Sequence, residues 1–218
     1  MKQVKIDIVS DIACPWCAIG YARLARAMKQ LSAEYEFTIQ WHAFELNPEH
    51  SGIGEPILPA LAKKYGRSEE EMRANQNNMM TIAKNLGLNF ENLQQRLTCN
   101  TFDAHRLVKW AGEQGRQTAL KQALFDAYFG QALDVSDHKV LLSCVAALGL
   151  DPVRAKQILE SDQYSAAVRE DEASYQQAGI TSVPAFIINS KYLVSGAQEP
   201  EAWVQTLLTL HKAGAEPV

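Results

Sequence analysis

The sequence predicts an α/β fold in which two separated pieces of chain join one β-sheet, with an all-helical lid domain inserted between them. Strand and helix patterns alternate as β-α-β at the start of the chain and as α-β-β-α at its end, while the middle shows helical spacing only. The sheet domain is therefore predicted from residues 1–48 and 179–218, with a linking helix over 162–178, and the inserted domain from residues 49–161.

The first unit has the pattern of two strands joined by a helix. Residues 4–9 are rich in β-branched side chains and end at a Ser-Asp turn, which predicts a strand. Apolar residues at helical spacing then predict an amphipathic helix that begins near Pro15 and runs to about Glu34. A second strand is predicted over residues 37–46, and the right-handed crossover makes the two strands parallel.

The middle of the chain has helical patterns with clear signals for the start and end of each helix. A capping box at Ser68 to Glu71 opens one helix, and Asp151-Pro152 opens another as an N-cap followed by a proline. Helices are predicted over residues 55–65, 72–86, 101–113, 117–129, 137–148 and 152–160, and residues 88–100 are predicted to form an extended loop.

The last part of the chain returns to strand patterns. Residues 180–189 predict one strand and residues 192–195 a second, and the short turn between them makes an antiparallel hairpin. A terminal helix is predicted from about Glu199 through Leu210, with frayed residues after Gly214.

Composition narrows the classes of partner and compartment. The net charge of −4 and the pI of about 5.8, with no basic stripe, argue against nucleic acid. The amino terminus lacks the apolar stretch of a signal peptide, and no window of about eighteen apolar residues would cross a membrane. A cytoplasmic protein is therefore expected, in which a Cys-x-x-Cys pair is catalytic more often than structural.

The predicted redox centre is the pair Cys14 and Cys17 at the start of the first helix. Pro15 takes the first helical position, where its missing N–H costs nothing. Free backbone N–H groups and the helix dipole favour a thiolate on Cys14. Cys17 lies one turn further in, so we expect Cys14 to attack a disulfide and Cys17 to close the internal disulfide that expels the bound partner.

Two other interpretations of the cysteine pair stay open at this point. Such a pair can be half of a zinc site, but the remaining cysteines, Cys99 and Cys144, are isolated and the histidines form no closely spaced pair. No metal site is therefore predicted. Two buried and inert cysteines are the second alternative.

Five motifs resemble, in this order along nearly the whole chain, the thioredoxin-fold proteins of the DsbA-like family, and more closely its FrnE-type cytosolic dithiol oxidoreductases. The motifs are Ser10-Asp11-x-x-Cys14-Pro15-Trp16-Cys17-x-x-Gly20, Phe44-x-Leu46-Asn47-Pro48, Asn100-Thr101-x-x-Ala104-His105-Arg106-Leu107, Val183-Pro184-x-Phe186 and Ser195-Gly196-Ala197-Gln198. The resemblance implies a thioredoxin-like sheet domain that carries the helical insertion.

The resemblance also implies how a substrate binds at the site. It makes Pro184 a cis proline that faces the sulfurs, with the backbone of Val183 free to hydrogen-bond an extended substrate. An ordinary trans proline at the start of a strand is the alternative. Glutathione-dependent isomerases and transferases of this family have serine at the position of Cys14 and an acidic pair where this chain has Ala197-Gln198. We therefore expect no tightly held cofactor, with glutathione able to act as a redox partner.

Further residues have two interpretations each. Asp11 could carry protons for the cysteines or only stabilise the turn, and Trp16 could contact substrates or pack against the lid. Because Trp16 supplies no positive charge to a thiolate, a less oxidising site than that of periplasmic relatives is expected. Asn100 and His105 are substrate-binding candidates, although an exposed helix face is the more usual place for such a histidine.

His42, on the second predicted strand, is a weak site candidate of the same kind as His105. Cys99 could act as a third thiol or be buried and inert, and Cys144 is predicted to lie in the core. The adjacent methionines Met79 and Met80 fill the core or offer an adaptable surface to a substrate.

The function predicted from these features is a thiol-disulfide oxidoreductase or isomerase acting on a disulfide-containing protein or a small thiol, as a monomer or a homodimer. A glutathione-dependent isomerase or transferase of small molecules and a redox-sensing binding module are the alternatives. Neither nucleic acid nor a membrane is expected as a partner.

Overall fold

The computed structural model describes residues 1–215, and the side chains of residues 1–210. Its four-stranded sheet has the order β2-β1-β3-β4. The strands are β1 (Lys2–Ser10), β2 (Tyr35–Ala43), β3 (Ala185–Ile188) and β4 (Tyr192–Ser195). The helices are α1 (Pro15–Leu31), α2 (Ile57–Tyr65), α3 (Glu69–Leu86), α4 (Phe102–Glu113), α5 (Gln117–Phe125), α6 (His138–Ala147), α7 (Pro152–Leu159), α8 (Ser165–Gln177) and α9 (Pro200–Ala215), with a π-helical turn at Asp126–Gly130.

Strand β1 lies in the middle of the sheet and fixes where the two cysteines sit. It runs parallel to β2 and antiparallel to β3, so that Ile8 lies between Trp41 and Phe186. Strands β3 and β4 form the predicted antiparallel hairpin. Because β1 ends where β3 begins, the segment that carries Cys14 is brought beside Pro184.

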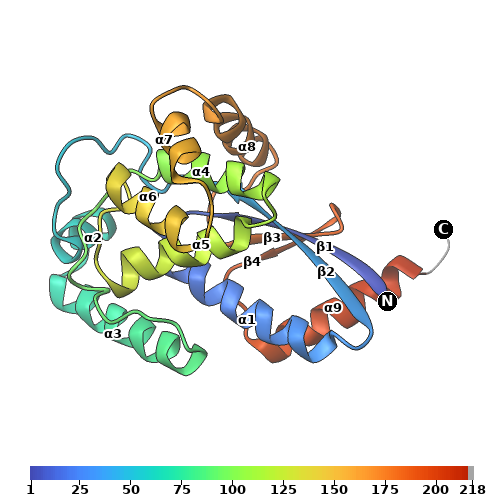
Figure 1. Ribbon diagram of the computed structural model, residues 1–218. Coiled ribbons are helices and arrows are strands. Elements are labelled where there is room, and N and C mark those ends of the chain that lie inside the picture. Colours follow the sequence, from blue (N-terminus) through green and yellow to red (C-terminus); the bar gives the residue numbers. More distant parts are fainter. Residues whose placement is uncertain (216–218) are drawn as a thin grey trace.

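Helices cover both faces of the sheet (Figure 1). Helices α1 and α9 pack against each other on one face, while α8 and α4 lie over β2 on the other. Helix α5 contacts both β2 and α1. This arrangement places the helical segment over the end of the sheet that carries the cysteines.

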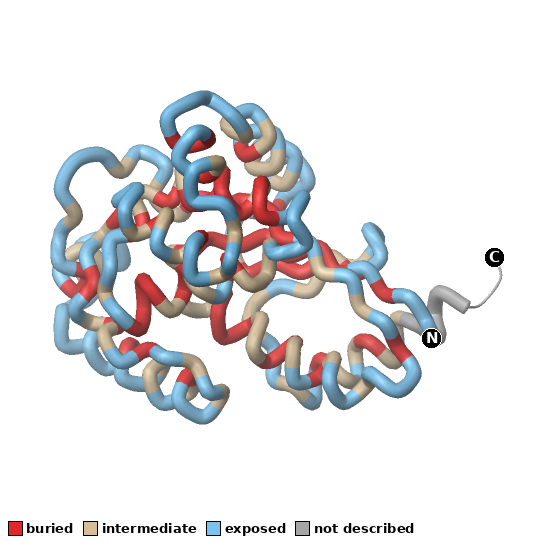
Figure 2. The backbone as a smooth tube through the Cα atoms, viewed as in Figure 1, coloured by how far each residue is buried: buried red, intermediate tan, exposed pale blue. Residues whose placement is uncertain are grey.

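One continuous apolar core joins the sheet to the helices. It includes Ile8 on β1, Trp203 on α9 and Phe125 on α5, all of them buried. Figure 2 shows the buried trace running along the sheet and the inner sides of the helices. The α/β thioredoxin-like fold with its helical segment is thus confirmed, whereas the division into domains at residues 48/49 and 161/162 stays a prediction.

Several element boundaries differ from the prediction; β3, for example, begins at Ala185 rather than at residue 180, and α8 begins at Ser165 rather than at residue 162. Strand β2 ends at Ala43 rather than at residue 46, because the chain turns away to donate the Leu46 N–H to Asp11. The helix predicted over 117–129 changes to a π-helical turn after Phe125. Helix α1 ends at Leu31, three residues early.

The predicted fraying after Gly214 falls partly on residues 216–218, which lie outside the described part of the chain. Within the described residues, none of the helices combines the length and apolar character needed to cross a membrane.

Candidate functional site

The two cysteines lie on the first turn of α1. Cys14 is the N-cap residue, with extended backbone angles (φ −96°, ψ 107°), and Pro15 follows at the first helical position as predicted. The Cys14 N–H donates to the Asp11 carbonyl at 3.3 Å, and the Cys17 N–H donates to the Cys14 carbonyl at 3.0 Å. Both thiols are free of a disulfide in this structure.

The two sulfurs have different surroundings. Cys14 keeps 5% of its surface exposed and Cys17 none, which confirms that Cys17 is the more enclosed of the two. Burial, followed by the neighbouring Cys14, raises the pKa of the Cys17 thiol well above its usual value. Cys17 therefore holds its proton near neutral pH until something removes it.

The start of β3 lies directly against Cys14. The Val183–Pro184 peptide bond is cis, so the trans alternative is wrong. The Cys14 Sγ lies 3.8 Å from the Val183 carbonyl oxygen. Helix α1 comes this close because Gly20 has no side chain: a Cβ there would lie 3.2 Å from both Pro184 Cγ and Phe186 Cζ.

Asp11 supports the turn that leads into the dithiol. Its Oδ2 accepts the Leu46 N–H at 2.7 Å, and its Oδ1 accepts the Ala13 N–H and the His105 ring Nε2, both at 3.3 Å. Burial acts to raise the pKa of Asp11, but the hydrogen bonds that it accepts from His105 and from the Leu46 N–H lower it below its usual value. Asp11 is therefore a fixed carboxylate, as expected for the turn-stabilising role.

His105 is almost wholly buried, so the expectation of an exposed helix face is wrong. Its Nε2 faces two acceptors, Asp11 and the Phe44 carbonyl at 3.1 Å, and therefore carries the ring proton. Burial and the nearby Lys121 lower the pKa of His105, which keeps the ring neutral. The histidine supports Asp11 through this hydrogen bond, and its predicted contact with substrate stays a prediction.

The other predicted support and binding residues are partly buried. Trp16 packs against the core cluster, which favours the packing interpretation. Asn100 accepts the Phe102 N–H at 2.9 Å and donates to Glu45 at 3.2 Å, so it orders the start of α4. Its role in substrate binding stays a prediction. Met79 and Met80 also pack against the core, as the core-filling interpretation expects.

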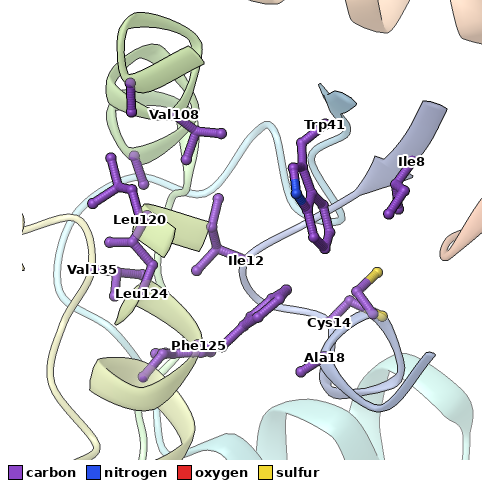
Figure 3. Close-up of a cluster of buried hydrophobic side chains, with 14 of the residues drawn as sticks. Ile8, Ile12, Cys14, Ala18, Trp41, Val108, Leu120, Leu124, Phe125 and Val135 are labelled. Atoms are coloured by element: carbon purple, nitrogen blue, oxygen red, sulfur yellow. The ribbon is translucent and has the colours of Figure 1, made fainter. Parts of the chain in front are cut away.

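Lys121 is a site residue that the sequence analysis missed. It is fully buried on α5, and its Nζ donates to the Ser10 carbonyl at 3.3 Å. The ammonium lies over the rings of Trp41 (5.5 Å) and Phe125 (5.6 Å). Figure 3 shows these two rings in the same cluster of buried side chains as Cys14. Burial lowers the pKa of Lys121 to about 8, against the raising effect of negative charge on Asp11 and the two active-site sulfurs.

A helical signal for Lys121 was present in the sequence. Lys121, Leu124, Phe125 and Tyr128 follow each other at i, i+3, i+4 and i+7, so they share one helix face. The last three are apolar or aromatic and buried, which puts the lysine on the inner side of the helix.

The cysteines outside the pair differ from each other. Burial raises the pKa of Cys99 to about 12, which fits the buried and inert interpretation. The buried Arg96 nearby donates to Gln76 Oε1 at 3.0 Å and stacks on Tyr128. Cys144 is partly buried and packs against the core cluster, as predicted, while the fully buried positions of α6 are Leu141 and Val145.

The described residues contain no cluster of three or more His, Cys, Asp or Glu side chains arranged to hold a metal ion. Cys14 Sγ has the Val183 carbonyl oxygen as its neighbour at 3.8 Å rather than a further metal ligand. The arrangement thus suits sulfur chemistry.

The fold and the dithiol together define a thioredoxin-type protein. A family model described as the DSBA-like thioredoxin domain matches residues 5–208, so the chain belongs to this family. The chain thus has the DsbA-like thiol-disulfide oxidoreductase fold.

Individual relatives agree with this membership. A structure described as a probable DsbA oxidoreductase from Streptomyces coelicolor is 34% identical, with a TM-score of 0.90 over 99% of this chain and 92% of that one. The uncharacterized protein YwbO of Bacillus subtilis is 28% identical over 89% of this chain and 91% of its own. The cytosolic disulfide reductase DsbM of Pseudomonas aeruginosa, determined with GSH, shares the fold at 16% identity, with a TM-score of 0.66 over 95% of this chain and 99% of that one.

Proposed function

We propose that this protein is a dithiol-disulfide oxidoreductase that works through a mixed disulfide on Cys14. The observation that supports this proposal is the difference between the two cysteines. Cys14 lies at a helix start with its Sγ 3.8 Å from the Val183 carbonyl oxygen, whereas Cys17 is fully buried. Cys14 thiolate attacks a substrate disulfide and releases one substrate thiolate. Cys17 then attacks Cys14 Sγ, which forms the internal disulfide and releases the second thiolate.

The substrate would lie along the start of β3. Within the described residues, neither backbone group of Val183 pairs with another backbone group. An extended chain could therefore hydrogen-bond there, independent of its sequence, with its disulfide over Cys14. The proposal covers two substrate classes: disulfide-containing proteins and small-molecule disulfides or thiols. In it, Pro184 shapes the surface on which the substrate lies, and Pro15, Trp16 and Asp11 support the cysteines. Asn100 and His105 order the loop beside the site.

The proposal includes no bound cofactor besides the Cys14–Cys17 disulfide itself. Glutathione as a redox partner is supported by the fold-related DsbM, which is described with GSH and as a cytosolic reductase. A cytosolic FrnE-type role, including disulfide isomerisation, belongs to the same proposal.

Two single substitutions test the mechanism. Cys14→Ser should lower the reduction of insulin disulfides by a factor on the order of 10³ or more, because the attacking sulfur is gone. Cys17→Ser should instead accumulate a mixed disulfide between Cys14 and the substrate, visible as a mass adduct. Cys144→Ser serves as the matched control and should keep full turnover. Normal turnover by Cys14→Ser would reject the proposal.

The two other function classes are separable by the same variants. Glutathione-dependent turnover of a small molecule that survives Cys17→Ser would indicate an isomerase or transferase. A ligand affinity that depends on the redox state, without any disulfide reduction, would indicate a binding module.

A further inference from the structure

Strand β2 forms one edge of the sheet, and side chains cover the last part of that edge. The amide of Gln117 pairs with both backbone groups of Trp41: its Oε1 accepts the Trp41 N–H at 2.9 Å, and its Nε2 donates to the Trp41 carbonyl at 3.1 Å. Asp171 Oδ2 accepts the Ala43 N–H at 3.1 Å. The outer edge of β2 is therefore closed where the strand ends.

The middle of the same edge is open. Because the backbone groups of successive strand residues point to opposite sides, the outward direction seen at Trp41 and Ala43 also holds for Phe37 and Ile39. Within the described part of the chain, nothing hydrogen-bonds to the outward N–H and C=O groups of these two residues. Such a row of unpaired backbone groups is a template for another strand.

A groove of about 740 Å³ lies along this open segment. Its lining comes from β2, the end of α4 and the start of α5, and includes Thr38, Gln40, Lys109, Glu113 and Arg116. Lys109 already pairs with Asp171, and Glu113 accepts the Tyr164 hydroxyl. Arg116 forms no salt bridge with a carboxylate of residues 1–210. On a chain with a net charge of −4, the groove thus offers one unpaired positive charge.

We propose that two copies of this chain pair along β2, antiparallel, around a two-fold axis at Thr38. In this register Phe37 of each copy lies opposite Ile39 of the other, so all the open backbone groups join in four hydrogen bonds. Thr38 meets its own symmetry mate, which is a favourable cross-strand pair. An axis at Ile39 would instead place Phe37 opposite Trp41, whose outward groups Gln117 already occupies.

Charge complementarity supports a second copy as the occupant. With the axis at Thr38, Glu36 of each copy lies opposite Gln40 of the other, at the groove that Arg116 lines. Glu36 is exposed, and the side-chain amide of Gln3 donates to it at 2.6 Å, so its charge is not neutralised. The two-fold axis uses this contact twice. An axis nearer the start of the strand would move Glu36 away from Arg116 and toward its own symmetry mate.

Cysteine cross-linking tests the register. Directly opposite residues of a non-hydrogen-bonded antiparallel pair have Cα atoms about 4.5 Å apart, which is within disulfide range. In a background of Cys14→Ser, Cys17→Ser and Cys144→Ser, Thr38→Cys should therefore oxidise to a disulfide-linked dimer on a non-reducing gel.

Gln40→Cys is the matched control for the cross-link. It lines the same groove, but four residues along the strands separate it from its symmetry mate, about 14 Å, so it should stay unlinked. Failure of Thr38→Cys to cross-link, or equal cross-linking of both variants, would overturn the proposed register.

Sedimentation measures the pairing without new cysteines. We expect a reversible dimer with a Kd on the order of 10–100 μM, because the proposed contact is small. Arg116→Glu and Glu36→Arg should each raise the Kd at least about tenfold, since each places like charges at both symmetric contacts. An equimolar mixture of these two variants should recover the wild-type Kd, because opposite charges then meet at both contacts.

Lys139→Glu makes the same charge change at an exposed position of α6 and should leave the Kd unchanged. A wild-type chain that stays monomeric up to about 1 mM, or charge variants that dimerise like the wild type, would overturn the inference. A monomer whose Phe37 and Ile39 amide resonances shift on addition of an extended peptide would assign this edge to another partner and overturn it as well. None of these outcomes depends on the dithiol, so the proposed function is tested separately.

Discussion

Two buried polar clusters lie on the same sheet and are built differently. The active-site cluster consists of Asp11, His105 and Lys121, next to the dithiol. The strand cluster consists of Asp7, His42, Lys109 and Asp171, between the sheet and helices α4 and α8.

In the strand cluster every cation faces a carboxylate. His42 contacts Asp7 through Nε2 at 2.9 Å and Asp171 through Nδ1 at 3.2 Å. Lys109 pairs with Asp171 at 2.5 Å, and Lys5 closes the network by pairing with Asp7 at 3.0 Å. His42 thus holds a structural position, and its weak standing as a site residue finds no support here.

In the active-site cluster the charged groups are paired less completely. Asp11 is satisfied by hydrogen bonds, but Lys121 has one carbonyl and two aromatic rings around it. The comparison shows that each cation of the strand cluster has a carboxylate partner, whereas Lys121 in the active-site cluster is held by a carbonyl and two aromatic rings. The predictions below test this contrast, starting with the largest effect on stability.

Asp11→Ala should lower the free energy of unfolding by about 3 kcal/mol, since the Leu46 N–H and the His105 ring lose a buried acceptor. Chemical denaturation at neutral pH measures this loss. Asp11→Asn is the matched control, because it keeps an acceptor and should cost less.

The pH dependence of stability at acid pH gives a second prediction for Asp11. Its pKa in the folded protein is lowered below 3.8, so its contribution is present above that pH and is lost as the pH falls through the lower folded value. The alanine variant should therefore lose less of its remaining stability in this acid range than the wild type does. Equal stability of Asp11→Ala and wild type at neutral pH would contradict the claim that the hydrogen bonds of Asp11 stabilise the active-site cluster.

Asp171→Asn should cost about 2 kcal/mol of stability and leave disulfide reduction unchanged within about twofold. The amide keeps an acceptor for the Ala43 N–H but removes the charge that His42 and Lys109 share. Denaturation and insulin reduction on the same preparation check both halves. A large loss of turnover in a stable, folded variant would show that the strand cluster also serves the reaction.

Substitution of Glu45 is expected to have the smallest effect on stability, and the pH dependence that Glu45 causes has the opposite sign to that of Asp11. Burial, with the nearby Glu172 charge, raises its pKa to about 7 against the attraction of Arg169, which donates to Glu45 at 2.6 Å. Because the folded state then binds the proton more tightly than the unfolded chain, wild-type stability falls as the pH rises from about 4.5 to about 7. Glu45→Gln should remove this fall, so it gains on the order of 1 kcal/mol relative to wild type between pH 5 and pH 8. Parallel stability curves for the two proteins would contradict the assignment.

Local patterns were enough to predict the order of the elements and the position of the dithiol. The change from strand to helix spacing after Asp11 marked the helix start, and the short hairpin turn marked β3 and β4. These features depend on residues that are neighbours in the sequence.

Features that depend on distant partners were missed. His105 is buried by contact with Asp11, 94 positions away, and Lys121 by contact with Ser10, 111 positions away. Sequence patterns place a histidine or a lysine on a helix face, but they do not say what will cover that face. The early end of β2 has the same cause, since Asp11 draws the Leu46 N–H out of strand geometry.

The most direct test of the central claim compares Cys14 with Cys144 in the reduced wild-type protein. Cys144 is the more exposed thiol, and burial still raises its pKa, while Cys14 is the sulfur placed at the helix start. With limiting iodoacetamide and peptide mass mapping, the account predicts that Cys14 is alkylated first and that Cys144 follows slowly. Labelling of Cys144 or Cys99 ahead of Cys14 would contradict it.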